Sequence, residues 1–289
     1  MTAKKKRITK HVVGDACHLV NCYLAKHKQE KHEFSGIEFS NLGAQGRQPL
    51  FDVSRSQKGT IMAYWKDEHK KYIVITAPEP GFEIRAPKNM RGYFWHSKIT
   101  HLDVSHLDVS NTTDFSRCFS SFGYGGLSEK ISSEIIGLEN WDVSKGENFA
   151  FMFDSAFPAN KSISLDLSSW RFNPNKGIRF WNMFQGFGLQ ANKVILDVSG
   201  WNTTNVYDFD QTFKQFAPHA KTVELRGIED WCLGTGSISL DYTFDGFAKE
   251  SSCCLDLSKW SIGRAQKPRM ENFSNGVFFR IKEPTWENY

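Results

Sequence analysis

One phrase recurs along this chain and constrains its fold more than any other feature of the sequence. The phrase is Leu-Asp, then Val or Leu, then Ser, and its clearest copies begin at Leu102, Leu165, Leu196 and Leu255. In the later copies a tryptophan follows the serine by two residues. Repetition at a fixed period predicts a repeat solenoid, in which each repeat is stable only when it stacks on its neighbours.

The tryptophan position sets the length of one repeat. Counted from Leu107, which holds this position in the first copy, the spacings are 34, 29, 31, 30 and 29 residues. The tryptophans are Trp141, Trp170, Trp201, Trp231 and Trp260. These spacings predict about six repeats. The sixth copy is degenerate, as expected of the end of a stack.

Pairs of phenylalanines, four residues apart, follow the tryptophan position. The clear pairs are Phe115 and Phe119, Phe149 and Phe153, Phe180 and Phe184, and Phe209 and Phe213. The alternation in Leu-x-Val/Leu predicts a short β-strand whose apolar residues point inward. The four-residue spacing predicts a short helical turn. We therefore expect each coil to contain one short strand and one helical turn around a core of tryptophan and phenylalanine.

The chain divides into three parts by its sequence: a basic tail and N-terminal helix over 1–47, a β-hairpin capping region over 48–101, and the repeats over 102–289. The first two parts together predict an α+β cap. The tail contains the basic run Lys4, Lys5, Lys6 and Arg7. Histidines and cysteines in the expected helix over 10–32 match no common zinc spacing, so we expect neither a metal nor another cofactor. Two β-rich runs flanking a charged turn predict the hairpin over 59–75.

Charge and hydropathy exclude several classes of protein. The net charge of +4 is mild and does not require a nucleic-acid partner. The N-terminal residues lack the apolar core of a signal peptide, and no window reaches the length of a membrane span. The six cysteines are not spaced as a disulfide framework, which fits a reducing compartment. We expect a chain that is cytoplasmic as synthesised, with delivery elsewhere by a route without a classical signal peptide as the alternative.

The repeats resemble the BspA-like leucine-rich repeat family. The resemblance lies in the run Leu196 to Val206, in Trp141-Asp142-Val143-Ser144, and in Leu107 to Asn111. It implies leucine-rich-repeat-like coils, and it also implies a surface protein, because members are mostly bacterial and protist adhesins that bind host proteins. Phenylalanine replaces the family's usual methionine at the first residue of each pair, so this chain is a divergent relative.

No catalytic motif is recognisable in the sequence, and we expect no enzymatic activity. A solenoid offers a broad, rigid surface, so the leading hypothesis is a protein–protein interaction module, for example an effector or an inhibitor of a host factor. The expected contact face contains the outward residues of the repeated phrase. These are Asp103, Ser105, Asp166, Ser168, Asp197, Ser199, Asp256 and Ser258. We interpret the aspartates as solvated residues or local turn residues rather than as a cation-binding column.

Three other functions are weighed against this one. A surface adhesin or a receptor- or glycan-binding protein is the main alternative, and exposed aromatic side chains would favour it. A nucleic-acid partner would bind through the basic tail, with a steep dependence of affinity on salt. An enzyme located in the N-terminal region is the least favoured. The oligomeric state does not follow from these patterns.

Overall fold

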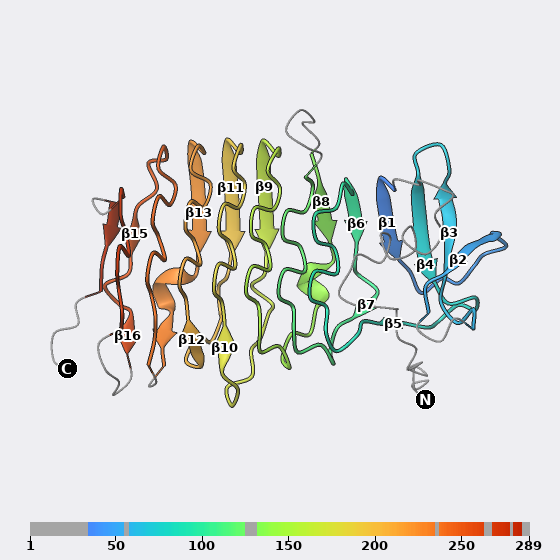
Figure 1. Cartoon of the computed structure of the whole chain (residues 1–289), viewed down its shortest axis with the longest axis horizontal. Coiled ribbons are helices and arrows are strands. Elements are labelled where there is room, and N and C mark those ends of the chain that lie inside the picture. Colours follow the sequence, from blue (N-terminus) through green and yellow to red (C-terminus); the bar gives the residue numbers. More distant parts are fainter. Residues whose placement is uncertain are drawn as a thin grey trace.

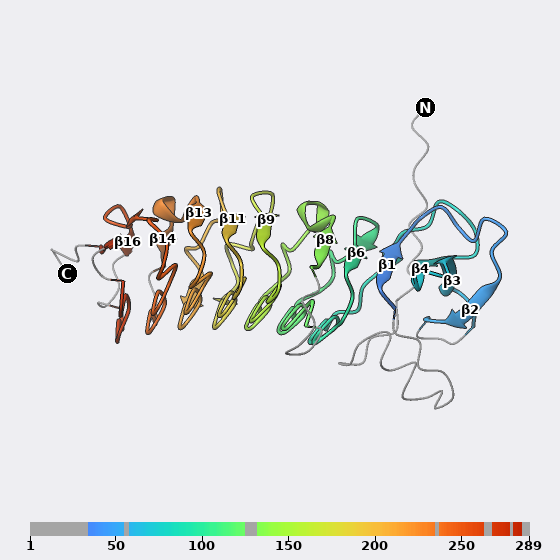
Figure 2. The same cartoon turned by 90° about the horizontal axis from the view of Figure 1, so that it is seen from above.

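The computed structural model of the chain describes residues 34–54, 58–124, 132–234, 237–262, 268–277 and 280–284. The fold is mostly β, with short parallel strands in series around a large buried aromatic core. Figures 1 and 2 show the repeats as narrow loops of chain, one behind the other, with an antiparallel hairpin region at the N-terminal end. The basic tail and the helix expected over 10–32 lie outside the described residues.

The first series of strands contains the repeated phrase or its equivalent. Its members are β1 (Gly36–Phe39), β6 (His101–Asp103), β8 (Glu134–Ile136), β9 (Ser162–Asp166), β11 (Lys193–Asp197), β13 (Thr222–Arg226), β15 (Leu255–Asp256) and β17 (Ile281–Lys282). Parallel pairing joins β1 to β6 and β6 to β8, then β9 to β11 and β11 to β13, and finally β15 to β17. The repeats are thus in register, with Leu165, Leu196 and Leu225 side by side.

A second series of strands follows the turn, with no member in the second repeat, where the described residues form only isolated bridges at Asn148. It consists of β5 (Ile84–Arg85), β7 (Leu107–Asp108), β10 (Ile178–Arg179), β12 (Val206–Asp208), β14 (Cys232–Leu233) and β16 (Ser261–Ile262). These strands pair in parallel as β5 with β7, β10 with β12, and β14 with β16. Two short 3-10 helices, η1 (Leu138–Asn140) and η2 (Ile228–Asp230), lie between the two series in the second and fifth repeats.

The N-terminal region forms the hairpin that the sequence predicts. Strands β3 (Met62–Asp67) and β4 (Tyr72–Thr76) are antiparallel, and β2 (Pro49–Asp52) pairs with β3. β1 connects this hairpin to the repeats, because it pairs with β4 on one side and with β6 on the other. The resulting six-stranded sheet, β2-β3-β4-β1-β6-β8, covers the first end of the stack.

The predicted helical turn at each phenylalanine pair is wrong. The described residues contain no α-helix, and the segment from Phe115 is a run of β-turns in which the Cys118 N–H donates to the Phe115 carbonyl. The alternate N–H groups donate to the next repeat, as Phe115 does to the Asn148 carbonyl and Phe119 to the Met152 carbonyl. An α-helix would use all these donors internally. Here half of them bind neighbouring repeats, and the four-residue spacing results from consecutive turns.

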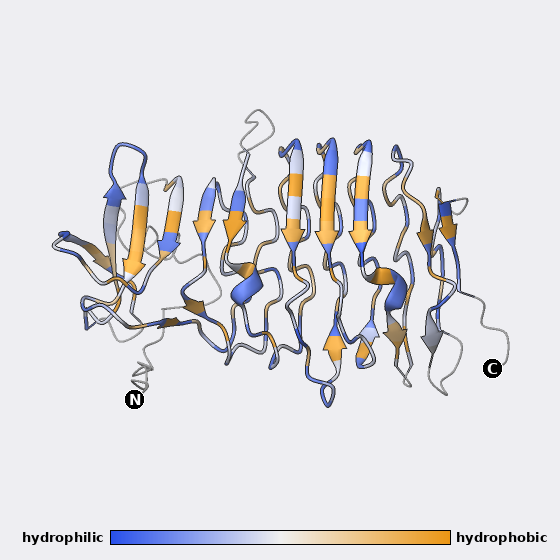
Figure 3. Ribbon diagram, turned by 180° about the vertical axis from the view of Figure 1, so that it is seen from behind, coloured by the Kyte–Doolittle hydropathy of each residue, from blue (hydrophilic) through white to orange (hydrophobic). Residues whose placement is uncertain are grey.

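All the tryptophans and phenylalanines expected in the core are buried. The indole rings of Trp141, Trp170, Trp201, Trp231 and Trp260 form one stack, with centroids 5.9–6.5 Å apart and interplanar angles of 2–16°. The rings of Phe94, Phe119, Phe153, Phe184, Phe213 and Phe244 form a second stack at 5.2–5.6 Å. Figure 3 shows the accompanying alternation of hydrophobic and hydrophilic residues along the central strands.

Hydrogen bonds fix the tryptophans in the direction of the stack. The Nε1 atoms of Trp170 and Trp201 donate to the carbonyls of Leu138 and Leu167, each at 2.8 Å. In both cases the acceptor belongs to the preceding repeat and lies three residues before that repeat's own tryptophan position. Each such indole therefore contacts its neighbour through its ring face and through its polar edge.

We predict that Trp201→Ala lowers the free energy of unfolding by about 3–5 kcal/mol, because it removes a ring that stacks on both neighbouring repeats. Trp201→Phe keeps an aromatic ring and loses the bond to Leu167, so its loss should be smaller. Denaturant titration followed by circular dichroism measures both. Tyr207→Ala, at a residue that is 48% exposed, is the control. Equal midpoints for Trp201→Ala and the control would contradict the stacked core.

Candidate interaction surfaces

The outward face of the first strand series is polar and regular; we call it the strand face. In β9, β11 and β13 the inward residues are buried, while the residues between them are half-buried or exposed. Register brings Ser164, Ile195 and Glu224 side by side. The next rung contains Asp166, Asp197 and Arg226. Arg226 pairs with Glu224, so both charges lie in one small area.

The predicted aspartates lie at the ends of these strands, where each bonds a local backbone group. The carboxylates of Asp103, Asp166 and Asp197 accept the N–H two residues further on at 2.9 Å, and that of Asp256 does so at 3.0 Å. These hydrogen bonds confirm the interpretation of the aspartates as turn residues. Asparagine could accept the same bond without a charge, which separates the turn role from any electrostatic role.

The predicted serines divide into two groups. Ser105 packs directly against Gly137 of the following repeat, and Ser199 packs in the same way against Gly227. These glycines precede η1 and η2. A Cβ atom at Gly227 would be 2.3 Å from the Cα atom of Ser199. Ser105 and Ser199 therefore serve as packing positions. The other two serines, Ser168 and Ser258, lie in repeats that are followed by no such glycine.

Sequence reasoning missed this second kind of turn, although a signal was present. The runs Gly-Leu-Glu-Asn-Trp at 137–141 and Gly-Ile-Glu-Asp-Trp at 227–231 match each other and replace the Leu-Asp-Val-Ser phrase. Both glycines have positive φ, +93° and +83°. Where a repeat lacks the aspartate that closes the turn, the glycine and the 3-10 helix close it in its place.

Hydrogen bonds and burial shift the pKa values of the carboxyl groups in opposite directions. The Ser168 side chain and N–H lower the pKa of Asp166. The Ser258 side chain, with Lys282, lowers the pKa of Asp256 to about 2. In the phenylalanine turns the direction reverses, because burial raises the pKa of Asp154 and of Asp210. Asp166 and Asp256 on the strand face therefore stay ionised to lower pH than Asp154 and Asp210 in the phenylalanine turns.

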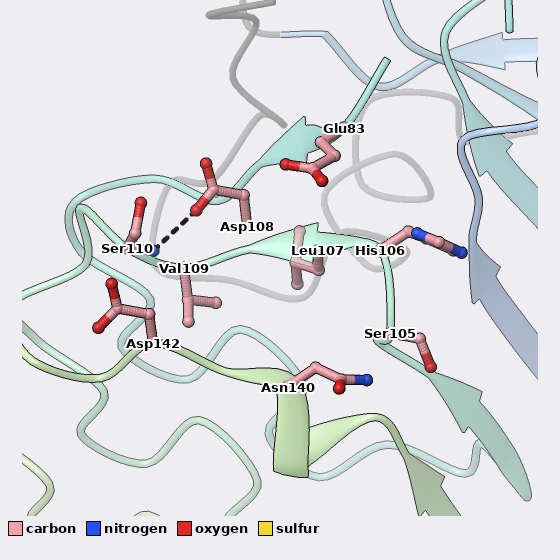
Figure 4. Close-up of a pocket in the computed structure, with 9 residues that line it drawn as sticks. All are labelled: Glu83, Ser105, His106, Leu107, Asp108, Val109, Ser110, Asn140 and Asp142. Atoms are coloured by element: carbon pink, nitrogen blue, oxygen red, sulfur yellow. Dashed lines mark hydrogen bonds between the residues drawn. The ribbon is translucent and has the colours of Figure 1, made fainter. Parts of the chain in front are cut away.

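A pocket of about 200 Å³ opens where the first repeat has Leu107 in place of a tryptophan. Figure 4 shows the residues around it. Its polar lining includes Glu83, His106, Asp108 and Asp142. Asp108 accepts hydrogen bonds from the Ser110 N–H at 3.0 Å and from Arg85 at 3.2 Å, so its charge is already paired. The remaining carboxylates would favour a cationic group of a ligand.

An arginine–aromatic cluster lies on the phenylalanine turns, and the sequence reasoning did not identify it. The Arg117 guanidinium lies 4.0 Å from the centre of the Phe151 ring, and that of Arg179 lies 4.4 Å from a ring of Trp181. The Phe151 and Trp181 rings meet edge to face at 4.7 Å. All four side chains are partly exposed. Arginine and tryptophan are enriched in the energetic centres of protein interfaces.

Part of the chain matches a known family. Residues 88–231 match the family described as "Mycoplasma protein of unknown function, DUF285". The match covers the first strand-and-turn repeats up to the fourth tryptophan of the stack. No curated protein and no solved structure matches the chain.

Metal binding and membrane insertion are two further properties that bear on the kind of site. In the described ranges no group of three or more histidine, cysteine, aspartate or glutamate side chains is arranged to hold a metal ion. Within the same ranges, no helix has the length and apolarity that a membrane span requires. The basic tail at Lys4, Lys5, Lys6 and Arg7 lies outside the described residues, so its role stays a prediction.

We predict that Gly227→Ala destabilises the protein by about 2–4 kcal/mol, which combines the strain of a positive φ with overpacking against Ser199. Gly81→Ala is the matched control. Gly81 has a similar φ of +87°, but a methyl group added there would have no atom within 4 Å, so only the strain remains. Thermal unfolding of both variants measures the difference. Equal losses would show that Ser199 yields without cost.

We predict that Asp256 titrates with a pKa of about 2 in the folded protein, against about 3.9 in an unfolded chain. A lowered folded pKa means that this carboxylate stabilises the fold above pH about 4, and that the contribution is lost as the pH falls toward 2. Carboxyl-carbon NMR measures the titration. Ser258→Ala should raise the midpoint, since the Ser258 side chain is the largest cause. An unchanged midpoint in that variant would contradict the assignment.

Proposed function

We propose that this chain is a non-enzymatic module that binds a macromolecular partner, with a protein as the favoured class. The proposal rests on the geometry of the strand face. Its outward side chains are held in register on strands whose inward residues are packed in the aromatic core. Such a face presents fixed side-chain positions at low entropic cost to binding.

The strand face has the composition of a surface for polar recognition. Ser164, Ile195 and Glu224 form one rung, and Asp166, Asp197 and Arg226 form the next. Ile136 in β8 adds an apolar residue that is 39% exposed. Opposite charges on neighbouring strands favour a partner with a complementary pattern of charges over one of uniform charge.

We also propose that the chain is a divergent member of the BspA-like leucine-rich repeat family. Parallel strands recurring about every thirty residues, the Leu-Asp-Val/Leu-Ser turn and the tryptophan stack support this proposal. The coils differ from the expectation in their phenylalanine segment, which is formed by turns instead of a helix. Membership of this family would imply that the protein acts as an adhesin or as a binding protein directed at a host.

A receptor- or glycan-binding protein is the second candidate, and exposed aromatic side chains favour it. Trp95 is 44% exposed and Tyr207 is 48% exposed. Aromatic rings of this kind stack on the apolar faces of sugars. A nucleic-acid partner through the basic tail, and an enzyme in the N-terminal region, have no support among the described residues.

The test of the strand face uses two charge swaps that each preserve net charge and an ion pair. Glu224→Lys with Arg226→Glu inverts the charge pattern of the face. Glu147→Lys with Lys176→Glu does the same to a pair elsewhere on the repeats. The proteins are immobilised, a partner retained from cell extract is identified by mass spectrometry, and its affinity is measured with purified components.

We predict that the strand-face swap weakens binding by at least about tenfold, as for charge patterns at a protein interface, and that the control swap leaves the affinity unchanged. Asp197→Asn, which keeps the acceptor for Ser199, should weaken binding without lowering the melting temperature. Equal affinity of both swaps for every retained partner would remove the strand face from the proposal.

A further inference from the structure

The segments that lead into β9, β11, β13 and β15 lie together at one long edge of the repeats. Parallel pairing places the starts of these strands at the same edge, which is at the top of Figure 1. Backbone hydrogen bonds join the segments directly. The Asn192 N–H donates to the Lys161 carbonyl at 2.8 Å, and the Lys221 N–H donates to the Asn192 carbonyl at 2.9 Å. We call them the lead-in segments, and they span 158–162, 188–193, 217–222 and 248–253.

Each lead-in segment contains one lysine, and we call these four residues the lysine edge. Its members are Lys161, Lys193, Lys221 and Lys249, and all four are exposed. Within the described parts of the chain none of them forms an ion pair. The lead-in segments contain a single carboxylate, that of Glu250, which lies 2.7 Å from the His219 ring. The edge therefore carries several positive charges with little to neutralise them.

Charges elsewhere on the repeats behave differently, because opposite charges of consecutive repeats pair there. These pairs are Lys176 with Glu147, Arg179 with Asp208, Lys214 with Asp245, and Arg269 with Asp241. On the lysine edge, stacking instead places like charges on successive rungs, which are about 4.8 Å apart. Like charges so close repel and raise the free energy of the folded chain. An anionic partner at this edge would remove that repulsion.

The opposite long edge of the strand face is acidic. The first-series strands end there, and we count the residues from each strand end to the next tryptophan position. The exposed or half-buried carboxylates of this acidic edge are Asp103, Glu139, Asp166, Asp197, Glu229, Asp230 and Asp256. They outnumber the basic side chains there, which are Arg226, Lys259 and Lys282. The repeats are therefore electrically polarised across the strands, from a basic edge to an acidic one.

We propose that the lysine edge docks on a lipid bilayer with an anionic surface, through the headgroups of acidic phospholipids. Figure 2 looks onto this edge and shows the coils in a straight row, so ammonium groups of successive repeats can reach a flat surface together. Three steps of about 4.8 Å give a row about 14 Å long. The acidic edge then points away from the bilayer, and this polarity fixes the orientation of the chain. The proposal does not depend on a partner of the strand face, which remains accessible.

The composition of the lead-in segments favours a bilayer over a nucleic acid. They contain no arginine and no phenylalanine, tyrosine or tryptophan. Single-stranded nucleic acids bind by stacking their bases on aromatic rings, and specific phosphate recognition favours the planar guanidinium group. Lysine is a flexible point charge that suits a layer of mobile headgroups. Leu189 lies among the lysines and is 42% exposed, so it can enter the boundary between headgroups and acyl chains.

The number of lysines sets the strength of the contact. Each lysine held near an anionic bilayer strengthens binding about fivefold, and the attraction falls off within a Debye length of the surface. Four lysines together favour an anionic over a neutral bilayer by roughly several hundredfold. Added salt screens this part of the binding, whereas the contribution of Leu189 is apolar and persists.

The first experiment measures binding of the full chain to vesicles by flotation over a series of lipid concentrations. The vesicles contain phosphatidylcholine alone, or phosphatidylcholine and phosphatidylglycerol in equal parts. The edge variant combines Lys161→Gln, Lys193→Gln and Lys221→Gln. The control variant combines Lys88→Gln, Lys145→Gln and Lys259→Gln, at exposed lysines outside the lead-in segments. Both variants lose the same net charge and keep the basic tail.

We expect the natural chain to bind the anionic vesicles and not the neutral ones. The edge variant should bind at least about a hundredfold more weakly, as the loss of three lysines requires, and the control variant should change by less than about fivefold. Melting temperatures of both variants should stay near that of the natural chain, because exposed residues without ion pairs contribute little to stability. Equal losses in the two variants, or a natural chain that does not bind anionic vesicles, would overturn the proposal.

The second experiment separates a bilayer from other partners of the lysine edge. Leu189→Gln should weaken binding to the anionic vesicles at least about threefold at every salt concentration, because an apolar side chain no longer enters the bilayer. The same substitution should not change binding of a single-stranded oligonucleotide. Sedimentation velocity without lipid tests whether the acidic edge of a second copy occupies the lysines. Oligonucleotide binding or self-association that the edge variant abolishes, in a chain that does not bind vesicles, would contradict the proposal.

Discussion

Stacking of identical aromatic positions in consecutive repeats is the interaction on which the rest of the structure depends. Each indole of the tryptophan stack contacts the next at 5.9–6.5 Å with nearly parallel planes. A second stack runs through the phenylalanine turns. These contacts are possible only if every repeat places its rings at the same height and angle. The repeat length, the strand register and the turn geometry are therefore all constrained by the aromatic core.

The backbone satisfies this constraint with two interchangeable turn closures. Four repeats close the turn after the first strand with an aspartate that accepts an N–H group two residues on. The second and fifth repeats close it with a left-handed glycine and a 3-10 helix. Both closures bring the chain to the tryptophan position in the same register. The second closure tolerates no side chain at Gly137 or Gly227, because the preceding repeat lies too close.

Much of the fold could be predicted from the sequence, because the tryptophan spacing and the Leu-Asp-Val/Leu-Ser phrase report directly on register and on an inward apolar pattern. The helical turn could not. A spacing of four between phenylalanines arises from one turn of helix and equally from two overlapping β-turns, and only the hydrogen bonds to the next repeat distinguish them. The arginine–aromatic cluster was missed for a related reason: Arg117, Phe151 and Trp181 come from three repeats, and their proximity depends on stacking.

Positions that repeat and positions that vary carry different information about function. The aspartates of the phrase recur because the turn requires their side-chain oxygen, so their repetition says little about a partner. The first left-handed position of each phenylalanine turn repeats a backbone conformation but not a residue, and Phe151 and Tyr242 occupy there a conformation that favours glycine. A side chain retained against its own backbone preference needs a compensating contact. For Arg117 and Phe151 that contact lies within the chain, where the guanidinium is 4.0 Å from the centre of the ring.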